Sequence, residues 1–250
     1  MKVHELWRHP VKSMGGERVT AVTLTERGVR DDRAWGVRDV ASGTILSAKR
    51  EGRLFGASAS LVNDLLSVTL PDGRVYDPGP ALDESLGRWL ERDVRLVEAD
   101  AYGVPVFQGV DDFENDASAL TSWEGMFGSF VDDSPLHLLT TGDLAQLARE
   151  RPELNWDVRR FRPNVVIDTP LISRSAWVQG QRLAIGDVEV EVTKACTRCV
   201  MTTRAQPGGL ERELDVLRHV ARHHEARVGV RARVTRTGEL RRGDVVSVLS

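Results

Sequence analysis

Two cysteines, Cys196 and Cys199, are the only ones in this chain, and they lie three residues apart. A thiolate is a soft metal ligand and a nucleophile, and the neighbouring charges of Lys194 and Arg198 favour the ionised form. The alternatives are two small buried side chains or a redox-active pair, although the helix that opens directly after a thioredoxin-like motif is not predicted here. These three roles remain open from the residues alone.

Other metal-binding patterns are weaker. Two cysteines cannot supply a four-cysteine zinc site or an iron–sulfur cluster. Three histidines, His219, His223 and His224, lie near the end of a predicted helix. A histidine pair at positions i and i+4 can bind zinc, but the glutamate and third ligand of a metalloprotease motif are missing. We therefore interpret these histidines as a solvated helix end.

Cations occur where the chain enters or leaves predicted strands. Lys12 and Ser13 precede a pair of glycines, and the exposed N–H groups of such a turn suit an anion. Arg33 and Arg162 each precede a strand. The proline after Arg162 predicts an extended backbone, from which a guanidinium can grip a phosphate with two hydrogen bonds. Ion pairs with neighbouring aspartates, or simple surface exposure, are the alternatives for these arginines.

The bulk composition is that of an ordinary globular protein. Hydrophobic residues make up 41% and charged residues 28%, and the formal net charge is -3. Arginines are interspersed with acidic residues, which argues against a nucleic-acid-binding face. The N-terminus lacks a basic segment followed by an apolar one, and no stretch approaches the ~20 apolar residues of a membrane span. We expect a cytoplasmic protein that binds neither nucleic acid nor a membrane.

The elements that would position these residues are mostly short strands. In the first part of the chain the pattern predicts strands at residues 19–24, 34–37 and 67–70 and a helix through Leu82 and Leu90, whereas residues 102–134 are predicted as irregular loops. Later strands are predicted at residues 137–139, 164–167, 188–192, 228–234 and 245–249, with helices at residues 144–148 and 210–221. The pattern predicts an α+β fold, mainly β, with a domain boundary near residue 110.

Four segments, taken in order, resemble the MOSC family. They are Pro-Val-Lys-Ser, Asp-Arg-Ala-Trp, Phe-Arg-Pro-Asn, and Cys-Thr-Arg-Cys followed shortly by two threonines. The family includes the mitochondrial amidoxime-reducing component and the C-terminal domain of molybdenum cofactor sulfurase. The resemblance covers nearly the whole chain. It implies an antiparallel, β-barrel-like MOSC domain at residues 111–250, packed with an N-terminal β-barrel domain at residues 1–110 and a few peripheral helices.

The resemblance also implies a molybdenum cofactor, in which molybdopterin holds the metal. Cys199 would be the thiolate ligand of molybdenum and the catalytic residue, and Cys196 would support it. The residues expected to bind the cofactor are Lys12, Ser13, Arg33, Thr140, Thr141, Arg162, Asn164, Cys196, Arg198 and Cys199. The two threonines are a looser match than the others.

The activity that the resemblance implies is reduction of small N-hydroxylated compounds. Two cysteines cannot ligate a [2Fe-2S] cluster, and the chain ends at Ser250 without the ferredoxin-like domain of some bacterial relatives. We therefore expect a separate ferredoxin- or cytochrome b5-like electron donor. The alternatives are a carrier of the cofactor or of persulfide sulfur, and a cofactor-free β-domain. Arg204 stands where the reductases commonly carry an aspartate, which weakens inference about the substrate more than about the cofactor.

Overall fold

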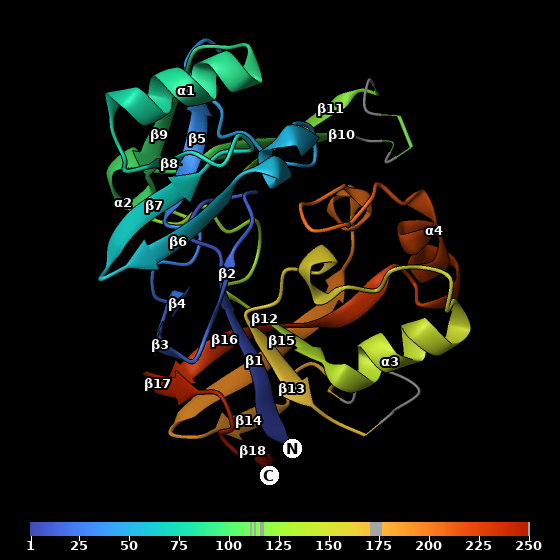
Figure 1. Ribbon diagram of the computed structural model, residues 1–250. Coiled ribbons are helices and arrows are strands. Elements are labelled where there is room, and N and C mark those ends of the chain that lie inside the picture. The colour runs from blue at the N-terminus through green and yellow to red at the C-terminus, as the bar shows by residue number, and fades with distance from the viewer. Residues whose placement is uncertain (111, 113, 116–117, 171–176, 250) are drawn as a thin grey trace.

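The computed structural model describes residues 1–110, 112, 114–115, 118–170 and 177–249. Strands predominate, and the helices lie at the periphery (Figure 1). An upper part in Figure 1 is built from residues of the first half of the chain, and a lower part mainly from the second half, with the N-terminal strand running into it. The expected α+β fold, mainly β, is confirmed.

An eight-stranded sheet forms the lower part. Its strands in spatial order are β18 (Val246–Leu249), β14 (Arg182–Ile185), β15 (Val188–Thr197), β16 (Arg227–Arg236), β12 (Leu136–Thr140), β13 (Val165–Asp168), β1 (Lys2–Arg8) and β2 (Glu17–Val19). Neighbours are antiparallel except for the parallel pair β12 and β13. The sheet curls like a barrel, because Val245 beside β18 bridges Lys2 in β1.

The core of this sheet follows from alternation along its strands. In β15 the side chains of Val188, Val190 and Val192 are fully buried, whereas those of Glu189 and Glu191 face outward and are half-buried. Successive residues of a strand point to opposite faces, so the apolar residues gather on one side. The predicted strand at residues 188–192 is confirmed, and it continues to Thr197.

The upper part combines small antiparallel sheets with one long helix. Its elements are β5 (Trp35–Asp39), the 3₁₀ helix η1 (Gly52–Gly56), β6 (Ser58–Val62), β7 (Leu65–Thr69), β8 (Val75–Tyr76), α1 (Pro80–Leu90), β9 (Val94–Glu98), α2 (Ala99–Tyr102), β10 (Val106–Val110) and β11 (Leu120–Glu124). The predicted helix is confirmed as α1, whose Leu82, Leu86 and Leu90 are buried against the sheets.

The prediction of irregular loops at residues 102–134 is wrong over part of its length. β10 and β11 form an antiparallel hairpin in which Phe107 pairs with Trp123, and their rings lie 5.9 Å apart between centroids. Cross-strand aromatic pairs stabilise such hairpins. Each of these two strands has few apolar residues, and a polar segment separates the strands, so the sequence shows no clear strand alternation here.

The N-terminal strands of the chain pair with strands of its second half. β1 pairs with β13 of the second half of the chain, and β3 (Ala21–Thr25) lies between β4 (Gly28–Val29) and β17 (Gly238–Arg241). The first thirty or so residues therefore belong structurally to the lower part, although they precede the upper part in sequence. The division into domains 1–110 and 111–250 stays a prediction.

The helices of the second half of the chain pack beside the large sheet (Figure 1). They are α3 (Thr141–Glu150), the 3₁₀ helices η2 (Val158–Arg160) and η3 (Val200–Thr203), and α4 (Leu214–His223). Leu147 of α3 and Val216 and Val220 of α4 share one apolar cluster with Trp156. The helix predicted from residue 210 begins at Leu214, where the Glu213 side chain caps it.

Among the described residues, no helix has the length and the apolar character that crossing a bilayer requires.

Candidate functional site

The two thiols lie in different environments. Cys196 is the penultimate residue of β15 and is fully buried, whereas Cys199 follows the strand, precedes η3 and is partly exposed. Among the described residues, Cys199 lines a cleft of about 230 Å³ and Cys196 does not. Cys199 therefore reaches the cleft, whereas Cys196 packs behind it.

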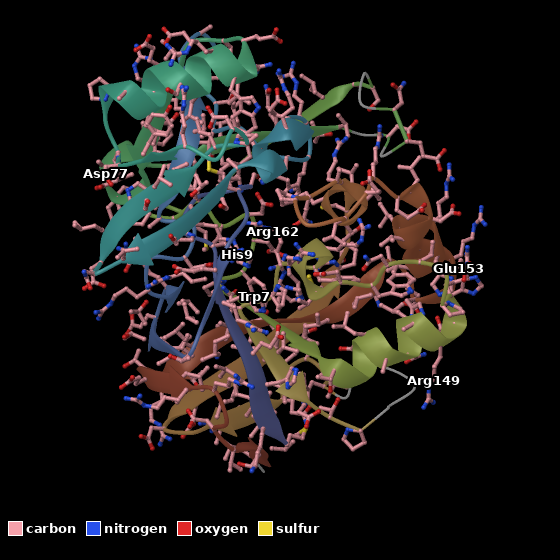
Figure 2. The ribbon with its side chains drawn as sticks, in the orientation of Figure 1. Trp7, His9, Asp77, Arg149, Glu153 and Arg162 are labelled. Carbon is pink, nitrogen blue, oxygen red and sulfur yellow. The ribbon has the colours of Figure 1, made fainter. Side chains whose placement is uncertain are left out.

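Positive charge dominates the walls of this cleft. The cationic side chains among its described lining residues are Lys12, Arg33, Lys49, Arg160, Arg162, Arg198 and Arg231, and the acidic ones are Asp132 and Asp133. They come from both parts of the molecule, and Figure 2 shows Arg162 where the two parts meet. A concave surface with this excess of cations attracts an anionic ligand.

Arg162 has a different backbone from the one predicted. Its φ of 52° lies in the left-handed region and not in the extended region. Its N–H donates to the Val158 carbonyl at 3.3 Å and so closes the turn of η2, while the following proline disfavours the right-handed helical conformation. The chain therefore turns sharply at Arg162 before β13 begins.

The guanidinium of Arg162 is buried and only partly satisfied. Nη1 donates to the Met14 carbonyl at 2.5 Å, whereas Nη2 has no partner among the described residues. Burial and the nearby charge of Arg33 lower the pKa of Arg162 to about 9, so the group remains charged at neutral pH. A buried cation with an unused donor is costly unless a ligand completes it, and a phosphate oxygen fits that requirement.

Ser13 and Arg33 share the left-handed backbone of Arg162, with φ values of 67° and 51°. The Ser13 hydroxyl accepts a hydrogen bond from the N–H of Ala48 at 2.9 Å. Arg33 forms an ion pair with Asp32, one of the alternatives left open by the sequence, and its Nη2 also donates to the Arg162 carbonyl at 3.3 Å. Non-glycine residues in this conformation cluster at functional sites, because the surrounding structure must compensate the strain.

Lys12 belongs to a network that the sequence did not predict. Its Nζ donates to Asp132 at 2.5 Å and to the Phe130 carbonyl at 2.8 Å, and Lys49 lies 3.1 Å from the other carboxylate oxygen of Asp132. Burial lowers the pKa of Lys12 to about 8, although Asp132 opposes the shift. Burial raises the pKa of Asp132, but Lys12 and Lys49 outweigh it and hold the pKa below its usual range. Lys49 and Asp132 carry no sequence motif.

Arg198 links the two cysteines to the arginine turn. Its Nη1 donates to the Cys196 sulfur at 2.9 Å and its Nη2 to the Phe161 carbonyl at 2.8 Å. Burial, together with the charge of Arg198, holds the pKa of His137 well below its usual range, so His137 is neutral. Its Nδ1 donates to the Arg162 carbonyl and its Nε2 accepts from Arg198, each at 3.4 Å. His137 therefore positions both arginines.

Besides Cys196, three predicted cofactor residues do not line the cleft. Thr140 accepts from the N–H of Asp143 at 2.9 Å in the capping box of α3, and Thr141 hydrogen-bonds to the end of β13. Asn164 is buried, with its Oδ1 accepting from the N–H of His137 at 3.1 Å. Helix capping occupies Thr140, and the Oδ1 of Asn164 braces β12, while the buried Nδ2 of Asn164 has no partner among the described residues. None of the three side chains has a contact surface in the cleft.

Arg204, the departure noted in the sequence, lies outside the cleft. It is buried, and its Nε and Nη2 donate to the carbonyls of Ala48 and Lys49 at 3.2 and 2.8 Å. The residue after the two threonines therefore ties η3 to the loop that carries Lys49. An aspartate, which accepts hydrogen bonds, could not make these contacts.

Comparisons with known proteins agree with this architecture. Residues 1–106 match the model of the MOSC N-terminal beta barrel domain, and residues 127–247 match that of the MOSC domain. The chain belongs to the MOSC family, with the barrel domain preceding the MOSC domain.

Relatives include mitochondrial amidoxime reducing component 2 of Rattus norvegicus, 25% identical over 80% of this chain and 66% of its own length. Molybdenum cofactor sulfurase of Caenorhabditis briggsae is 28% identical over 80% of this chain, which spans 28% of that protein. A crystal structure of the YUAD protein from Bacillus subtilis covers 99% of this chain and 94% of its own, with 10% identity and a TM-score of 0.48. The chain thus spans just under two thirds of the first of these relatives.

Proposed function

We propose that the cleft binds the molybdenum cofactor, with Cys199 as the protein ligand of molybdenum. The observation that carries the proposal is a partly exposed thiol at the edge of a cleft whose walls are mainly cationic. A soft thiolate suits molybdenum, and the cofactor's phosphate requires cations and N–H donors. The names of the relatives, an amidoxime reducing component and a molybdenum cofactor sulfurase, support the same ligand class.

The unused donor of Arg162 offers a test of fit. Its buried Nη2 faces no acceptor among the described residues, and the Nε of Arg198 is likewise buried without a partner. Both side chains line the cleft. An anionic group between them would supply the missing acceptors, so the residues present fit a phosphate-bearing cofactor. Arg162 and Arg198 would hold the anionic end, while Lys12, Ser13 and Arg33 line the same cleft.

The activity we propose is reduction of small N-hydroxylated compounds, with electrons from a separate donor protein. When bound, the cofactor supplies the two-electron chemistry. The chain's own residues orient it: Arg198 braces the turn between the cysteines, and His137 fixes Arg198 and the Arg162 carbonyl. Trp123 and Phe130 add apolar side chains to the lining of the cleft.

The burial of Cys196 favours this activity over persulfide transfer through that residue. Its sulfur has no exposed surface and accepts a hydrogen bond from Arg198. A sulfur acceptor could not reach it without opening of the cleft wall. A carrier of the intact cofactor would use the same cleft and the same thiol as the reductase. It would differ from the reductase only in that it does not turn over a substrate.

The first prediction concerns the metal ligand. We expect near-stoichiometric molybdenum and pterin in wild-type protein purified without air from cells that make the cofactor. Cys199→Ala should lose most of the molybdenum, because it removes the thiolate that reaches the cleft. Cys196→Ala, a matched control that removes the buried thiol, should retain it. Metal analysis and pterin fluorescence measure both.

The same proteins decide between the candidate activities. Turnover of an amidoxime with an artificial reductant, lost in Cys199→Ala, supports the reductase. Bound cofactor without turnover supports a cofactor carrier, and a cyanide-labile persulfide supports a sulfur carrier. Well-folded wild-type protein that contains neither molybdenum nor pterin would overturn the proposal.

A further inference from the structure

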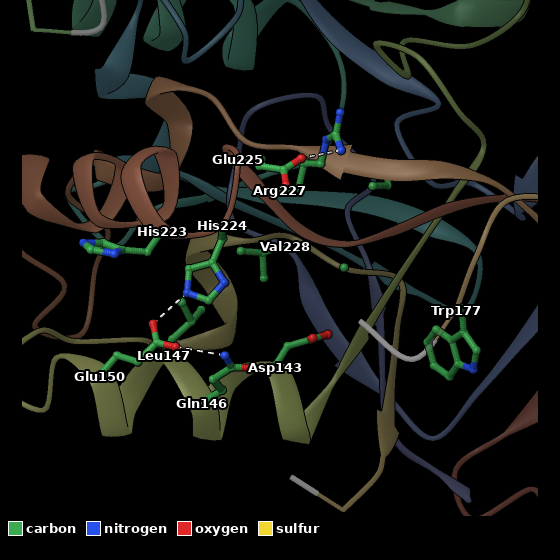
Figure 3. A pocket seen from close by; sticks show the side chains of 12 residues that line it. Asp143, Gln146, Leu147, Glu150, Trp177, His223, His224, Glu225, Arg227 and Val228 are labelled. Atoms are coloured by element: carbon green, nitrogen blue, oxygen red, sulfur yellow. Dashed lines mark hydrogen bonds and ion pairs between the residues drawn. The ribbon is translucent and has the colours of Figure 1, made fainter. Parts of the chain in front are cut away.

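Three potential metal ligands meet where α3 and α4 end. Glu150 is the last residue of α3, His219 lies in α4, and His224 follows the end of α4. The Nε2 atoms of His219 and His224 lie 2.7 and 2.6 Å from the same carboxylate oxygen of Glu150. All three ligand atoms lie within 4.8 Å of one another, and Figure 3 shows the approach of His224 to Glu150.

The interpretation of these histidines as a solvated helix end is wrong for His219. Its side chain is only 6% exposed, and its ring packs edge-on against Trp156 with 5.7 Å between centroids. The acidic partner comes from a helix 69 residues earlier in the chain. Tertiary packing thus supplies the carboxylate ligand that the local sequence lacks.

Neighbouring side chains hold the ligands in place. The other carboxylate oxygen of Glu150 accepts from Gln146 Nε2 at 2.9 Å, as Figure 3 shows. Gln146 thereby leaves the first oxygen directed at the two imidazoles, while Trp156 fixes the plane of His219. Supporting contacts of this kind orient metal ligands and raise metal affinity.

The donor set is one that zinc prefers. Two imidazole nitrogens and one carboxylate oxygen are the protein ligands of many open zinc sites, at about 2.0–2.2 Å from the ion. Tetrahedral placement at that radius separates ligand atoms by about 3.3 Å, so Glu150 and His224 would move outward by about 0.6 Å. Both side chains are partly exposed, at 31% and 17%, and such a shift disturbs little packing.

The surroundings favour a cation with an open coordination position. α3 and α4 both end at the cluster, and the carbonyl ends of helices carry partial negative charge. A cavity of about 420 Å³ opens beside it, lined by Glu150 and His224 together with Asp143 and Gln146. A water or a small ligand could occupy the fourth position from that side.

We propose that Glu150, His219 and His224 bind one Zn²⁺ ion. The ion would tie the C-terminal end of α3 to that of α4, with its open position facing the cavity. This site lies apart from the cleft of Cys199 and does not depend on the function proposed for it.

Calorimetric titration of the chelator-treated full-length chain with zinc chloride tests the proposal. We expect one zinc per chain in wild type, and at least about tenfold weaker binding in Glu150→Gln and His224→Ala. His223→Ala is the matched control, because this exposed histidine lies on the same helix end outside the ligand set. Cys199→Ala controls for zinc bound by the thiols. Both controls should bind zinc as wild type does.

Thermal unfolding gives an independent readout. Zinc should raise the melting temperature of wild type and of His223→Ala but not of His224→Ala, because an ion that binds only the folded state stabilises it. Circular dichroism shows whether each variant folds. Unchanged zinc affinity in folded Glu150→Gln and His224→Ala, or loss of binding in Cys199→Ala alone, would overturn the proposal.

Discussion

Lys12 shows how one buried side chain could control the charge of the cleft. Its amine is almost fully buried between Asp132 and Phe130, and Lys49 shares the same carboxylate. Burial lowers the pKa of Lys12 to about 8, so the charged form predominates at neutral pH and is lost as the pH rises above 8. The cleft then loses one of its lysine charges before Arg162, whose pKa is about 9, begins to lose its own.

The charge of Lys12 should control the affinity of the cleft for anions. Sulfate, whose charge is constant in this range, should bind wild type about tenfold more weakly at pH 9 than at pH 7, because binding must restore the proton on Lys12. Lys12→Arg keeps its charge throughout, so its sulfate affinity should change much less. Calorimetric titration at both pH values measures the difference. Equal pH dependence in the two proteins would show that Lys12 does not contact the anion.

Arg160 holds two short helices together and so fixes the segment that begins with Cys199. It is almost fully buried, with Nε donating to the Asn155 carbonyl at 2.8 Å, Nη1 to Thr202 at 3.2 Å and Nη2 to Glu211 at 2.9 Å. These contacts connect η2 to η3 and to the chain before α4. Burial lowers the pKa of Arg160, yet the three carbonyls provide the partners that a buried cation requires.

We expect Arg160→Met to lower the free energy of unfolding by about 3–5 kcal/mol, because methionine fills much of the volume but removes the hydrogen bonds from a buried guanidinium to three carbonyls. The free energy of unfolding of Arg160→Lys should lie between those of wild type and Arg160→Met, since an ammonium reaches fewer of these carbonyls. Urea denaturation followed by tryptophan fluorescence measures the change. A loss below about 1 kcal/mol for methionine would mean that water replaces the guanidinium.

Two buried histidines make the stability of the whole molecule depend on pH. His9 lies where β1 leaves the large sheet, and His137 lies in β12 of the same sheet. Burial first, and then neighbouring arginines, hold the pKa of each histidine well below its usual value of 6.5. The unfolded chain therefore binds more protons than the folded protein at mildly acidic pH.

The stability that these histidines contribute is complete above pH 6.5 and falls as the pH drops below it. As the pH falls below 6.5, each histidine should lower the free energy of unfolding by about 1.4 kcal/mol per pH unit, until its pKa in the folded protein is reached. Urea denaturation at several pH values between 7 and 4.5 gives the slope. His137→Asn, which retains polar contacts without titrating, should reduce that slope. A flat profile in wild type would contradict the neutral state of both histidines.

Several features of this protein follow from short-range patterns in the sequence. The helical spacing of Leu82, Leu86 and Leu90 predicts α1, and the alternation at residues 188–192 predicts β15, because burial of one face depends only on helical or strand periodicity. The end of β15 places Cys196 and Cys199 on opposite sides of the cleft wall. Cys199 and the cations Lys12, Arg33 and Arg162 could therefore be selected as candidate site residues from the sequence.

Other features arise only when distant segments come together. Asp132 meets Lys12 across 120 residues, and Glu150 meets His219 across 69, so neither pair has a spacing that a sequence pattern can reveal. The threonines at the start of α3 looked suited to a ligand, but the helix N-cap uses Thr140 itself. Residue types and local periodicity determined the elements and the chemistry available at Cys199. Tertiary packing alone decided which charges meet, because burial and long-range contact set the partners of each group.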